Sequence, residues 1–315
     1  MTLKLGIIMD PIEQIKIVKD SSFAMMLAAQ RRGWELHYMN QHHLYSDGGS
    51  TRAQTQTLTV QDDADSWFKV IARQDIALSE LDAVLMRKDP PFDIEYITTT
   101  WLLDSAERAG TLVVNRPASL RDANEKLFIT CFPQCCVPML VSSDPARIRQ
   151  FVAQHHDVIL KPLDSMGGHS IFRVQPDYQN LSVILELMTN GGRKTIMAQR
   201  FIPEITLGDK RILLIDGDPV PYALARVPAA GETRGNLAAG ATGVGMPLTE
   251  RDHWICAQVS PVLREMGILF AGLDVIGDYL TEINITSPTC IRELDQQYDL
   301  DIGGQLIASI ESRLS

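Results

Sequence analysis

The chain has 315 residues, of which 45% are hydrophobic and 22% charged. This composition is typical of a globular protein with a large core, and the length predicts two domains or three small ones. The net charge of −10 argues against nucleic acid or an anionic membrane as the main partner. Small anionic ligands remain compatible with it, because they need only local Lys and Arg side chains.

The cysteines indicate a reducing environment. There are five, with Cys135 and Cys136 adjacent and no C-x-x-C spacing, so no secreted disulfide framework is predicted. The first apolar run, residues 5–9, is too short for a signal peptide, and no apolar stretch is long enough to span a bilayer. A cytoplasmic protein with no membrane contact is therefore expected.

The first 120 residues predict alternating strands and helices, which is an α/β pattern. Strands are expected at 5–9, 34–39, 83–86 and 111–114, and a helix at 23–32 with Asp20 at its N-cap and Gly33 at its C-cap. Polar residues follow the strand ends at Asp10, 87–89 and 115–116. In open α/β sheets ligands bind outside the carboxyl ends of strands, so these are candidate contacts for an anionic substrate; the alternative is solvated loop charge.

The middle of the chain contains a glycine loop between two predicted strands. After a break near Arg116-Pro117, Asp122 is predicted to cap a helix with Glu125 at its third position. Asp144-Pro145 predicts a helix start, and strands are expected at 158–161, 171–174 and 195–202. The Gly167-Gly168 loop allows backbone N–H groups to approach a phosphate closely, although a plain hairpin turn is the alternative. No Walker-type P-loop occurs.

The last third combines a hairpin at 212–220, a long loop at 227–245 and a helix at 249–266. A loop of that length is usually a lid or a binding loop. Arg211, Arg226 and Arg234 lie near these elements, and a guanidinium stabilises anionic charge without acting as an acid or base. The alternative for each one is a surface salt bridge.

The segment 273–284 predicts a site for a hard divalent cation. Glu282 and Asn284 are two apart and therefore point to one face of a strand, while Asp274 lies on the preceding strand of a hairpin. A two-residue turn at Gly277-Asp278 would put Asp274 opposite Thr281, on the wrong face. A three-residue turn would put Asp274 opposite Glu282, so the cation site requires the longer turn. An ordinary edge hairpin with solvated polar residues is the alternative.

These residues, taken in chain order, resemble the ATP-grasp superfamily, and longer blocks resemble the bacterial glutathione synthetases. The blocks that carry the second resemblance are residues 9–11, 19–25, 86–93, 119–122, 231–240 and 280–293. The resemblance implies an α/β ATP-grasp fold with an N-terminal Rossmann-like domain. Expected domains are an N-terminal substrate domain at 1–121, a small ATP-grasp lid subdomain at 122–199, and a catalytic subdomain at 200–315 with its flexible loop at 227–245.

The resemblance also implies roles for individual residues. ATP as co-substrate would be bound by Lys126, Lys161, Gly167, Gly168, Gln199, Phe201, Ile202 and Asp209. Mg²⁺ or Mn²⁺ would be bound by Asp274, Glu282 and Asn284. The substrate contacts would be Asp20, Ser21, Ser22, Arg87, Asn236, Ser287, Pro288 and Thr289. The catalytic charge would come from Arg211, Arg226 and Arg234. The chain departs from the family pattern at Ser165, where another glycine is usual, and at 241–244, where polar residues are expected.

The implied activity is the ATP-dependent ligation of γ-glutamylcysteine and glycine through an acyl phosphate, in a cytoplasmic homotetramer. No residue is identified as the base for the glycine amine. Two other functions remain open: an ATP-grasp ligase for another acid and amine, such as glutamate or D-alanine, and a nucleotide-binding protein without catalysis. The first would differ at the substrate contacts, and the second would bind ATP without turnover.

Overall fold

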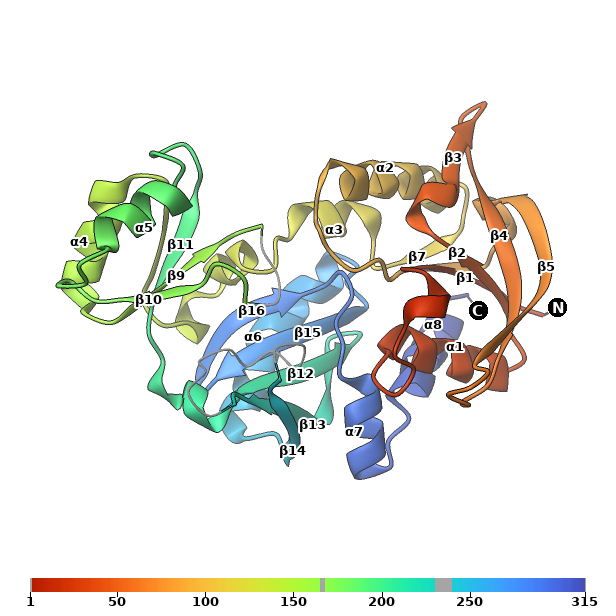
Figure 1. Ribbon diagram of the computed structural model, residues 1–315. Helices are drawn as coiled ribbons and strands as arrows, with labels where there is room; N and C mark the ends of the chain where they lie inside the picture. The colour runs from red at the N-terminus through yellow and green to blue at the C-terminus, as the bar shows by residue number, and fades with distance from the viewer. Residues whose placement is uncertain (1, 165–167, 230–239, 315) are drawn as a thin grey trace.

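The computed structural model describes residues 2–164, 168–229 and 240–314, which form three β-sheets with helices packed around them (Figure 1). The strands are β1 Lys4–Ile8, β2 Glu35–Met39, β3 Leu44–Asp47, β4 Ser50–Val60, β5 Phe68–Ala77, β6 Ala83–Met86, β7 Leu112–Val114, β8 Met139–Ser142, β9 Val158–Pro162, β10 Phe172–Val174, β11 Ile196–Arg200, β12 Asp209–Ile215, β13 Asp218–Val227, β14 Thr242–Pro247, β15 Phe270–Ile276 and β16 Tyr279–Asn284. The α-helices are α1 Ser21–Arg31, α2 Ile94–Arg108, α3 Pro117–Asp122, α4 Pro145–His155, α5 Leu181–Met188, α6 Glu250–Glu265, α7 Ile291–Tyr298 and α8 Ile302–Leu314. Short 3₁₀ helices are η1 Ile12–Gln14, η2 Gln41–His43, η3 Leu78–Glu80, η4 Leu127–Cys131, η5 Pro133–Cys135 and η6 Pro203–Leu207.

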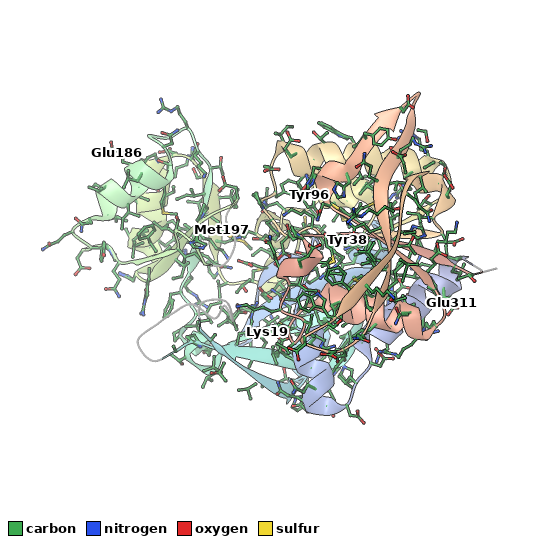
Figure 2. All side chains as sticks on the ribbon, turned by 45° about the vertical axis from the view of Figure 1, so that its right-hand side comes forward. Lys19, Tyr38, Tyr96, Glu186, Met197 and Glu311 are labelled. Atoms are coloured by element: carbon green, nitrogen blue, oxygen red, sulfur yellow. The ribbon has the colours of Figure 1, made fainter. Side chains whose placement is uncertain are left out.

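The N-terminal sheet has the order β3-β4-β2-β1-β6-β7, with β5 paired to β4. Strands β2, β1, β6 and β7 run parallel, as the α/β pattern predicts, so their carboxyl ends share one edge. Helix α1 begins where expected, because the Asp20 carboxylate accepts a hydrogen bond from Phe23 N at 2.6 Å. Figure 2 shows Tyr38 and Tyr96 inside this part of the molecule.

Strands β3 to β5 and helix α2 lie in segments without a predicted element. Strand β4 alternates buried and exposed positions, but Thr and Gln fill many of them, so its period of 2 carries little hydrophobic contrast. Helix α2 starts at Asp93, whose carboxylate accepts from Tyr96 N at 2.9 Å, and its first half is rich in threonine. Both segments are therefore poor in the apolar periodicity that predicts elements.

The prediction that a helix starts at Asp122 is wrong, because Asp122 is the last residue of α3. The chain turns at Asn124, whose side-chain oxygen accepts from Lys126 N at 3.1 Å and from Leu127 N at 2.9 Å. Asn124 therefore takes the role that the sequence pattern assigned to Asp122. The turn places Glu125 and Lys126 beside β16 instead of along a helix.

A four-stranded antiparallel sheet, β10-β9-β11-β8, forms a small lobe with α4 and α5. Its outer face has a core of its own, built on Ile148, Leu160 and Leu185. Met197 on the opposite face belongs instead to the core of the main body, and Figure 2 shows it where the lobe meets that body. The lobe thus has an independent interior and one packed face toward the rest of the protein.

The third sheet, β14-β13-β12-β15-β16, is antiparallel and packs between two large cores that it shares with the N-terminal sheet. The C-terminal helix α8 packs against α1, so the two ends of the described chain lie in the same part of the molecule (Figure 1). The sheets come from residues 4–114, 139–200 and 209–284. The domain limits at 121 and 199 remain predictions.

The loop predicted at 227–245 is too long at its far end, because residues 242–247 form β14, with Val227 paired to Thr242. Glycines in this strand serve close packing: a Cβ on Gly245 would lie 2.3 Å from Tyr298 Cε2. Its N–H donates to Gln297 Oε1 at 2.7 Å. The glycine-rich composition therefore conceals a strand that packs against α7.

Candidate active site

The hairpin β15–β16 places Asp274 directly opposite Glu282, as the predicted cation site requires. The turn itself has two residues, Gly277 and Asp278, so the expectation of a three-residue turn is wrong. A β-bulge after Asp274 supplies the missing residue, Thr281, whose hydroxyl donates to Asp274 O at 3.0 Å. The bulge shifts the register by one, and Glu282 therefore joins Asp274 on the inner face of the sheet.

Two arginines gather on Asp274. Arg211 lies opposite it on β12 and donates from Nε to Oδ1 at 2.5 Å, while Arg226 Nη2 lies 2.9 Å from Oδ2. All three side chains are at least nine-tenths buried. Burial alone would raise the pKa of Asp274, but the two guanidinium groups outweigh it and hold that pKa at about 2. Arg211 and Arg226 are therefore not surface salt bridges.

Asp209 extends this cluster. It is paired with Arg226 across β12 and β13, and its Oδ2 accepts from Arg226 Nη2 at 2.5 Å. Its other oxygen is buried and has no hydrogen-bond partner among the residues that the structure describes. Burial raises the pKa of Asp209 to about 7, against the opposing effect of Arg226. Asp209, which is predicted to lie beside bound ATP, is therefore part of this charged cluster.

Two buried lysines flank Glu282. Lys126 Nζ lies 3.8 Å and Lys161 Nζ 3.9 Å from Glu282 Oε1, and both residues are less than 5% exposed. Lys126 Nζ also contacts Glu125, and Lys161 Nζ donates to Thr281 O at 3.3 Å. Burial lowers the pKa of Lys161, whereas Glu282 and Glu125 outweigh burial and raise that of Lys126. Two buried ammonium groups thus meet at Glu282, and such groups can bind anions such as phosphates through charge-assisted hydrogen bonds.

Gln199 lies on β11, next to the β9 strand that carries Lys161. It is 4% exposed, and its Nε2 has no partner among the described atoms, so it could donate to a ligand. Phe201 stacks under Arg173 with Cζ 3.7 Å from the ring centre, and its N–H donates to Asp157 O. Ile202 is buried. These three residues lie on β11 and directly after it.

The predicted substrate contacts meet around Arg87. This guanidinium is 6% exposed, and it donates from Nε to Ser22 Oγ at 3.0 Å and from Nη2 to Pro288 O at 2.8 Å. No carboxylate forms an ion pair with it among the described residues, and burial lowers its pKa. A buried cation without an anionic partner can bind the carboxylate of a ligand.

The other predicted substrate contacts around Arg87 are held in place by contacts of their own. Ser21 Oγ accepts from Ile291 N at 3.3 Å, Ser287 Oγ donates to Asp89, and the Thr289 hydroxyl lies 3.8 Å from Cys290 Sγ. Asp20 is committed to the cap of α1, and burial raises its pKa. The structure therefore brings the predicted contacts from α1, β6 and residues 287–289 together. Gly167, Arg234 and Asn236 lie outside the described residues, as does Ser165, and Gly168 has a positive φ of 75°.

Asn115 has a different role from the one expected. Its Nδ2 donates to Phe270 O and Ile285 O, both at 2.7 Å, and its Oδ1 accepts from Leu269 N and Phe270 N. The amide is fully used and cannot bind a substrate. Asn115 connects the end of β7 to the start of β15 and to Ile285, which directly follows β16. The nearby Asp10 and Lys88 form an ion pair at 3.0 Å.

The donor set on the hairpin fits a divalent cation that prefers oxygen. A carboxylate can accept about four hydrogen bonds, and Asp274 accepts three from the two arginines, so one acceptor position is left for a cation. Asn284 donates from Nδ2 to Gly272 O at 3.3 Å, and its amide oxygen is left as a second possible ligand. No group of three or more His, Cys, Asp and Glu side chains suits a metal in the described part of the chain. A cation here would need the Asn284 amide as well as the two carboxylates.

Comparisons with known proteins agree with this geometry. Residues 3–121 match the model of the prokaryotic glutathione synthetase N-terminal domain, and residues 125–299 match that of the prokaryotic glutathione synthetase ATP-grasp domain. The chain is 62% identical over 314 residues to the glutathione synthetase of Pseudomonas putida and 61% identical over 315 residues to that of Pseudomonas aeruginosa. Both alignments cover 100% of this chain and 99% of the relative.

Solved structures support the fold at low sequence identity. The D-cycloserine synthetase DcsG superposes with a TM-score of 0.67 at 14% identity, covering 99% of this chain and 100% of that one. The ATP-grasp ligase PsnB, complexed with minimal precursor, Mg and ADP, gives 0.63 at 16% identity, covering 99% and 98%. No described helix has the length and apolar character to cross a bilayer. The chain belongs to the prokaryotic glutathione synthetase family and has the ATP-grasp fold.

Proposed function

We propose that this protein joins the cysteinyl carboxylate of γ-glutamylcysteine to the amine of glycine, with ATP converted to ADP and phosphate. The observation that carries the proposal is the juxtaposition of two buried lysines with the Asp274–Glu282 pair, in a chain about 60% identical to glutathione synthetases. The two lysines would bind phosphate beside carboxylates that would bind a cation. No protein nucleophile is required.

ATP would bind with its phosphates on Lys126 and Lys161. Gln199 on β11, with Phe201 and Ile202 just after that strand, would contact the adenine. The glycine loop that contains Gly167 and Gly168 would lie near the phosphates. The buried ammonium groups favour this orientation because the triphosphate is the most highly charged part of the nucleotide. Asp209 would then lie close to the phosphates, not to the base.

Mg²⁺ or Mn²⁺ would be held by Asp274, Glu282 and Asn284, and when bound it would neutralise charge on the phosphates. The first chemical step transfers the γ-phosphoryl group: a cysteinyl carboxylate oxygen bonds to phosphorus as the bond to ADP breaks. In the second step the neutral amine nitrogen bonds to the acyl carbon and loses a proton, the acyl carbon–oxygen bond breaks, and phosphate leaves. Arg211 and Arg226 supply fixed positive charge during both steps, since neither can lose its proton.

The dipeptide would lie against Arg87, with Asp20, Ser21, Ser22, Ser287, Pro288 and Thr289 around it. Arg87 is the anchor, because it is buried and has no carboxylate partner within the described structure. Arg234 and Asn236 would act from the segment between β13 and β14. We further propose a homotetramer, and a cytoplasmic location consistent with five unpaired cysteines.

The test is phosphate release from ATP by the purified protein with panels of acids and amines. Release that requires both γ-glutamylcysteine and glycine, with glutathione as the product, supports the proposal. Release with glutamate or D-alanine in their place would identify a different ATP-grasp ligase. ATP binding without turnover in every combination would identify a non-catalytic protein.

A further inference from the structure

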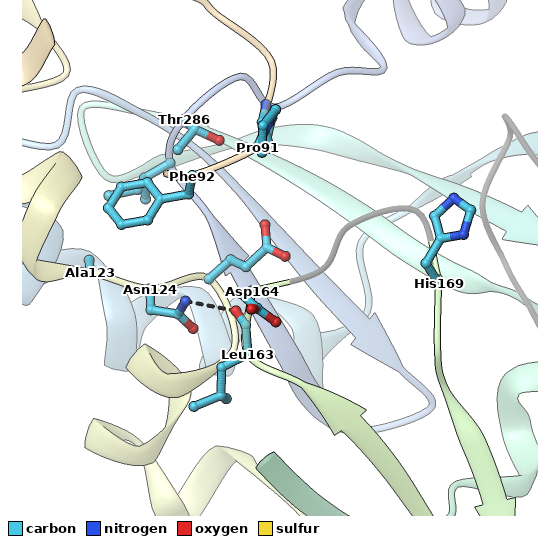
Figure 3. A pocket seen from close by; sticks show the side chains of 11 residues that line it. Pro91, Phe92, Ala123, Asn124, Leu163, Asp164, His169 and Thr286 are labelled. Carbon is cyan, nitrogen blue, oxygen red and sulfur yellow. Dashed lines mark hydrogen bonds between the residues drawn. The ribbon is translucent and has the colours of Figure 1, made fainter. Parts of the chain in front are cut away.

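A cavity of about 270 Å³ lies beside the charged cluster, and none of its lining residues belongs to the predicted site (Figure 3). Pro91 and Phe92 form one wall, Leu163 and Asp164 form another, and Glu125 and Thr286 complete the lining with their neighbours. The walls thus come from the segment between β6 and α2, the turn after α3, the segment after β9 of the small lobe and the segment after β16. Its volume is slightly below the roughly 300–1,000 Å³ of typical ligand pockets, which suits a small molecule.

The cavity lies next to the strand that carries the predicted cation ligands and next to the predicted substrate contacts. Glu125 O accepts from Ile283 N at 2.9 Å, and Ile283 lies between the two predicted cation ligands of β16. Thr286 directly precedes the predicted substrate contacts at 287–289. A small ligand in the cavity would therefore approach the carboxylate being phosphorylated.

The acidic lining residues differ in their surroundings. The Asp164 side chain is 60% exposed and forms an ion pair with Lys194 at 2.9 Å. The Glu125 side chain is only 21% exposed, and its partner is Lys126, which lies near Glu282 as well. Burial and Glu282 together raise the pKa of Glu125 despite Lys126. The Glu125 carboxylate therefore shares its cationic neighbour Lys126 with Glu282, and its negative charge is only partly compensated.

Nucleotide binding would increase this deficit. Phosphates on Lys126 would compete with Glu125 for the same ammonium group, so the carboxylate would then favour a new cation. Asn124 keeps Glu125 in place, because its Nδ2 donates to Leu163 O at 2.9 Å while its oxygen holds the Lys126 and Leu127 amides. A fixed carboxylate in a small, mostly apolar cavity suits a compact ligand with one ammonium group.

We propose that this cavity is the subsite for the amino-acid acceptor and that the Glu125 carboxylate accepts hydrogen bonds from its ammonium group. The inference rests on the proposed ligase function and identifies how the second substrate is recognised. The Pro91 and Phe92 wall offers no charged partner for a side chain, which favours glycine. The site gains affinity for the acceptor once ATP has bound.

The experiment compares two nucleophiles in Glu125→Gln. Glycine arrives as an ammonium ion, whereas hydroxylamine is uncharged at neutral pH and captures the acyl phosphate as a hydroxamate. Glu125→Gln is expected to raise KM for glycine at least tenfold, with hydroxamate formation and KM for ATP within threefold of wild type. Glu125→Asp should recover part of the glycine affinity. Asp164→Asn, a change at the same cavity, should leave both reactions within twofold.

Several results would overturn the inference. These are an unchanged KM for glycine in Glu125→Gln, an equal loss of the glycine and hydroxylamine reactions, or an Asp164→Asn effect as large as that of Glu125→Gln. Melting curves of both variants check folding, and Glu125→Asp carries the test if Glu125→Gln is unfolded. Wild-type protein that forms neither glutathione nor hydroxamate would instead contradict the proposed ligase function.

Discussion

Arg211 and Asp274 face each other across β12 and β15, and the arginine donates to both carboxylate oxygens, at 2.5 and 3.2 Å. Gly272 makes this packing possible, since a Cβ there would lie 2.8 Å from Arg211 Cδ. The pair holds Asp274 ionised in a buried place. An isolated buried carboxylate would take up a proton there. A predicted cation ligand is therefore kept charged by the arginines proposed to stabilise the transition state.

Arg226→Lys should lower kcat at least tenfold and change KM for ATP by less than threefold. Lysine keeps one positive charge but lacks the planar fork that reaches both Asp209 and Asp274. Steady-state kinetics with ATP varied at saturating acid and amine measures the effect. Arg264→Lys is the matched control, because Arg264 forms an exposed ion pair with Asp218. An effect confined to KM for ATP would contradict the assigned role.

Glu282→Gln should reduce turnover at least a hundredfold while the protein stays folded. The amide keeps the shape of the side chain but removes the charge shared by Lys126 and Lys161 and one proposed cation ligand. Turnover and thermal melting are measured on the same preparation. Glu265→Gln, on the exposed face of α6, serves as the control. Near-normal turnover would count against the cation site.

Asp209 should contribute to the free energy of unfolding of the wild type, and this contribution should decrease as pH rises. Its folded-state pKa of about 7 exceeds the unfolded value of about 3.9, so the folded state binds more protons between these values. Stability from this group is thus present near pH 4 and is lost as pH rises through 7. Urea unfolding from pH 5 to 8 should show Asp209→Asn gaining relative to wild type as pH rises. The control is Asp218→Asn, whose side chain is 84% exposed, and a pH-independent difference would contradict the assignment.

Asn115→Ala should destabilise the protein by about 3 kcal/mol and lower activity as well. The substitution removes four buried hydrogen bonds that join β7 to β15 and to Ile285. Urea unfolding and initial rates are compared with those of Asn180→Ala, because Asn180 precedes α5 without a side-chain cap. Loss of less than 1 kcal/mol would show that the amide does not connect the sheets as described.

Local sequence periodicity is sufficient to place the predicted cation ligands on one hairpin, but not to show how they align. Glu282 and Asn284 follow the strand period of 2, which depends only on neighbours in sequence. The β-bulge at Thr281 depends on pairing across the hairpin, so the predicted turn length was wrong although the pairing of Asp274 and Glu282 is correct.

Capping and ion pairing were harder to predict for the same reason. Asp122 and Asn124 are both good capping residues, and only the packing of the chain beside β16 selects Asn124. The partners of Arg211 and Arg226 follow from the register of three strands, which residue types do not reveal. The sequence pattern predicts a capping role for Glu125. Its position in the cavity wall depends on packing between segments far apart in the sequence, which the pattern does not show.

The fate of a labelled oxygen tests the central claim most directly. γ-Glutamylcysteine carrying ¹⁸O in both oxygens of its cysteinyl carboxylate is incubated with the protein, ATP and glycine, and the released phosphate is analysed by mass spectrometry. An acyl phosphate intermediate predicts one ¹⁸O atom in each phosphate formed with glutathione. Phosphate without the label, at equal yield of glutathione, would contradict phosphorylation of the carboxylate at this site.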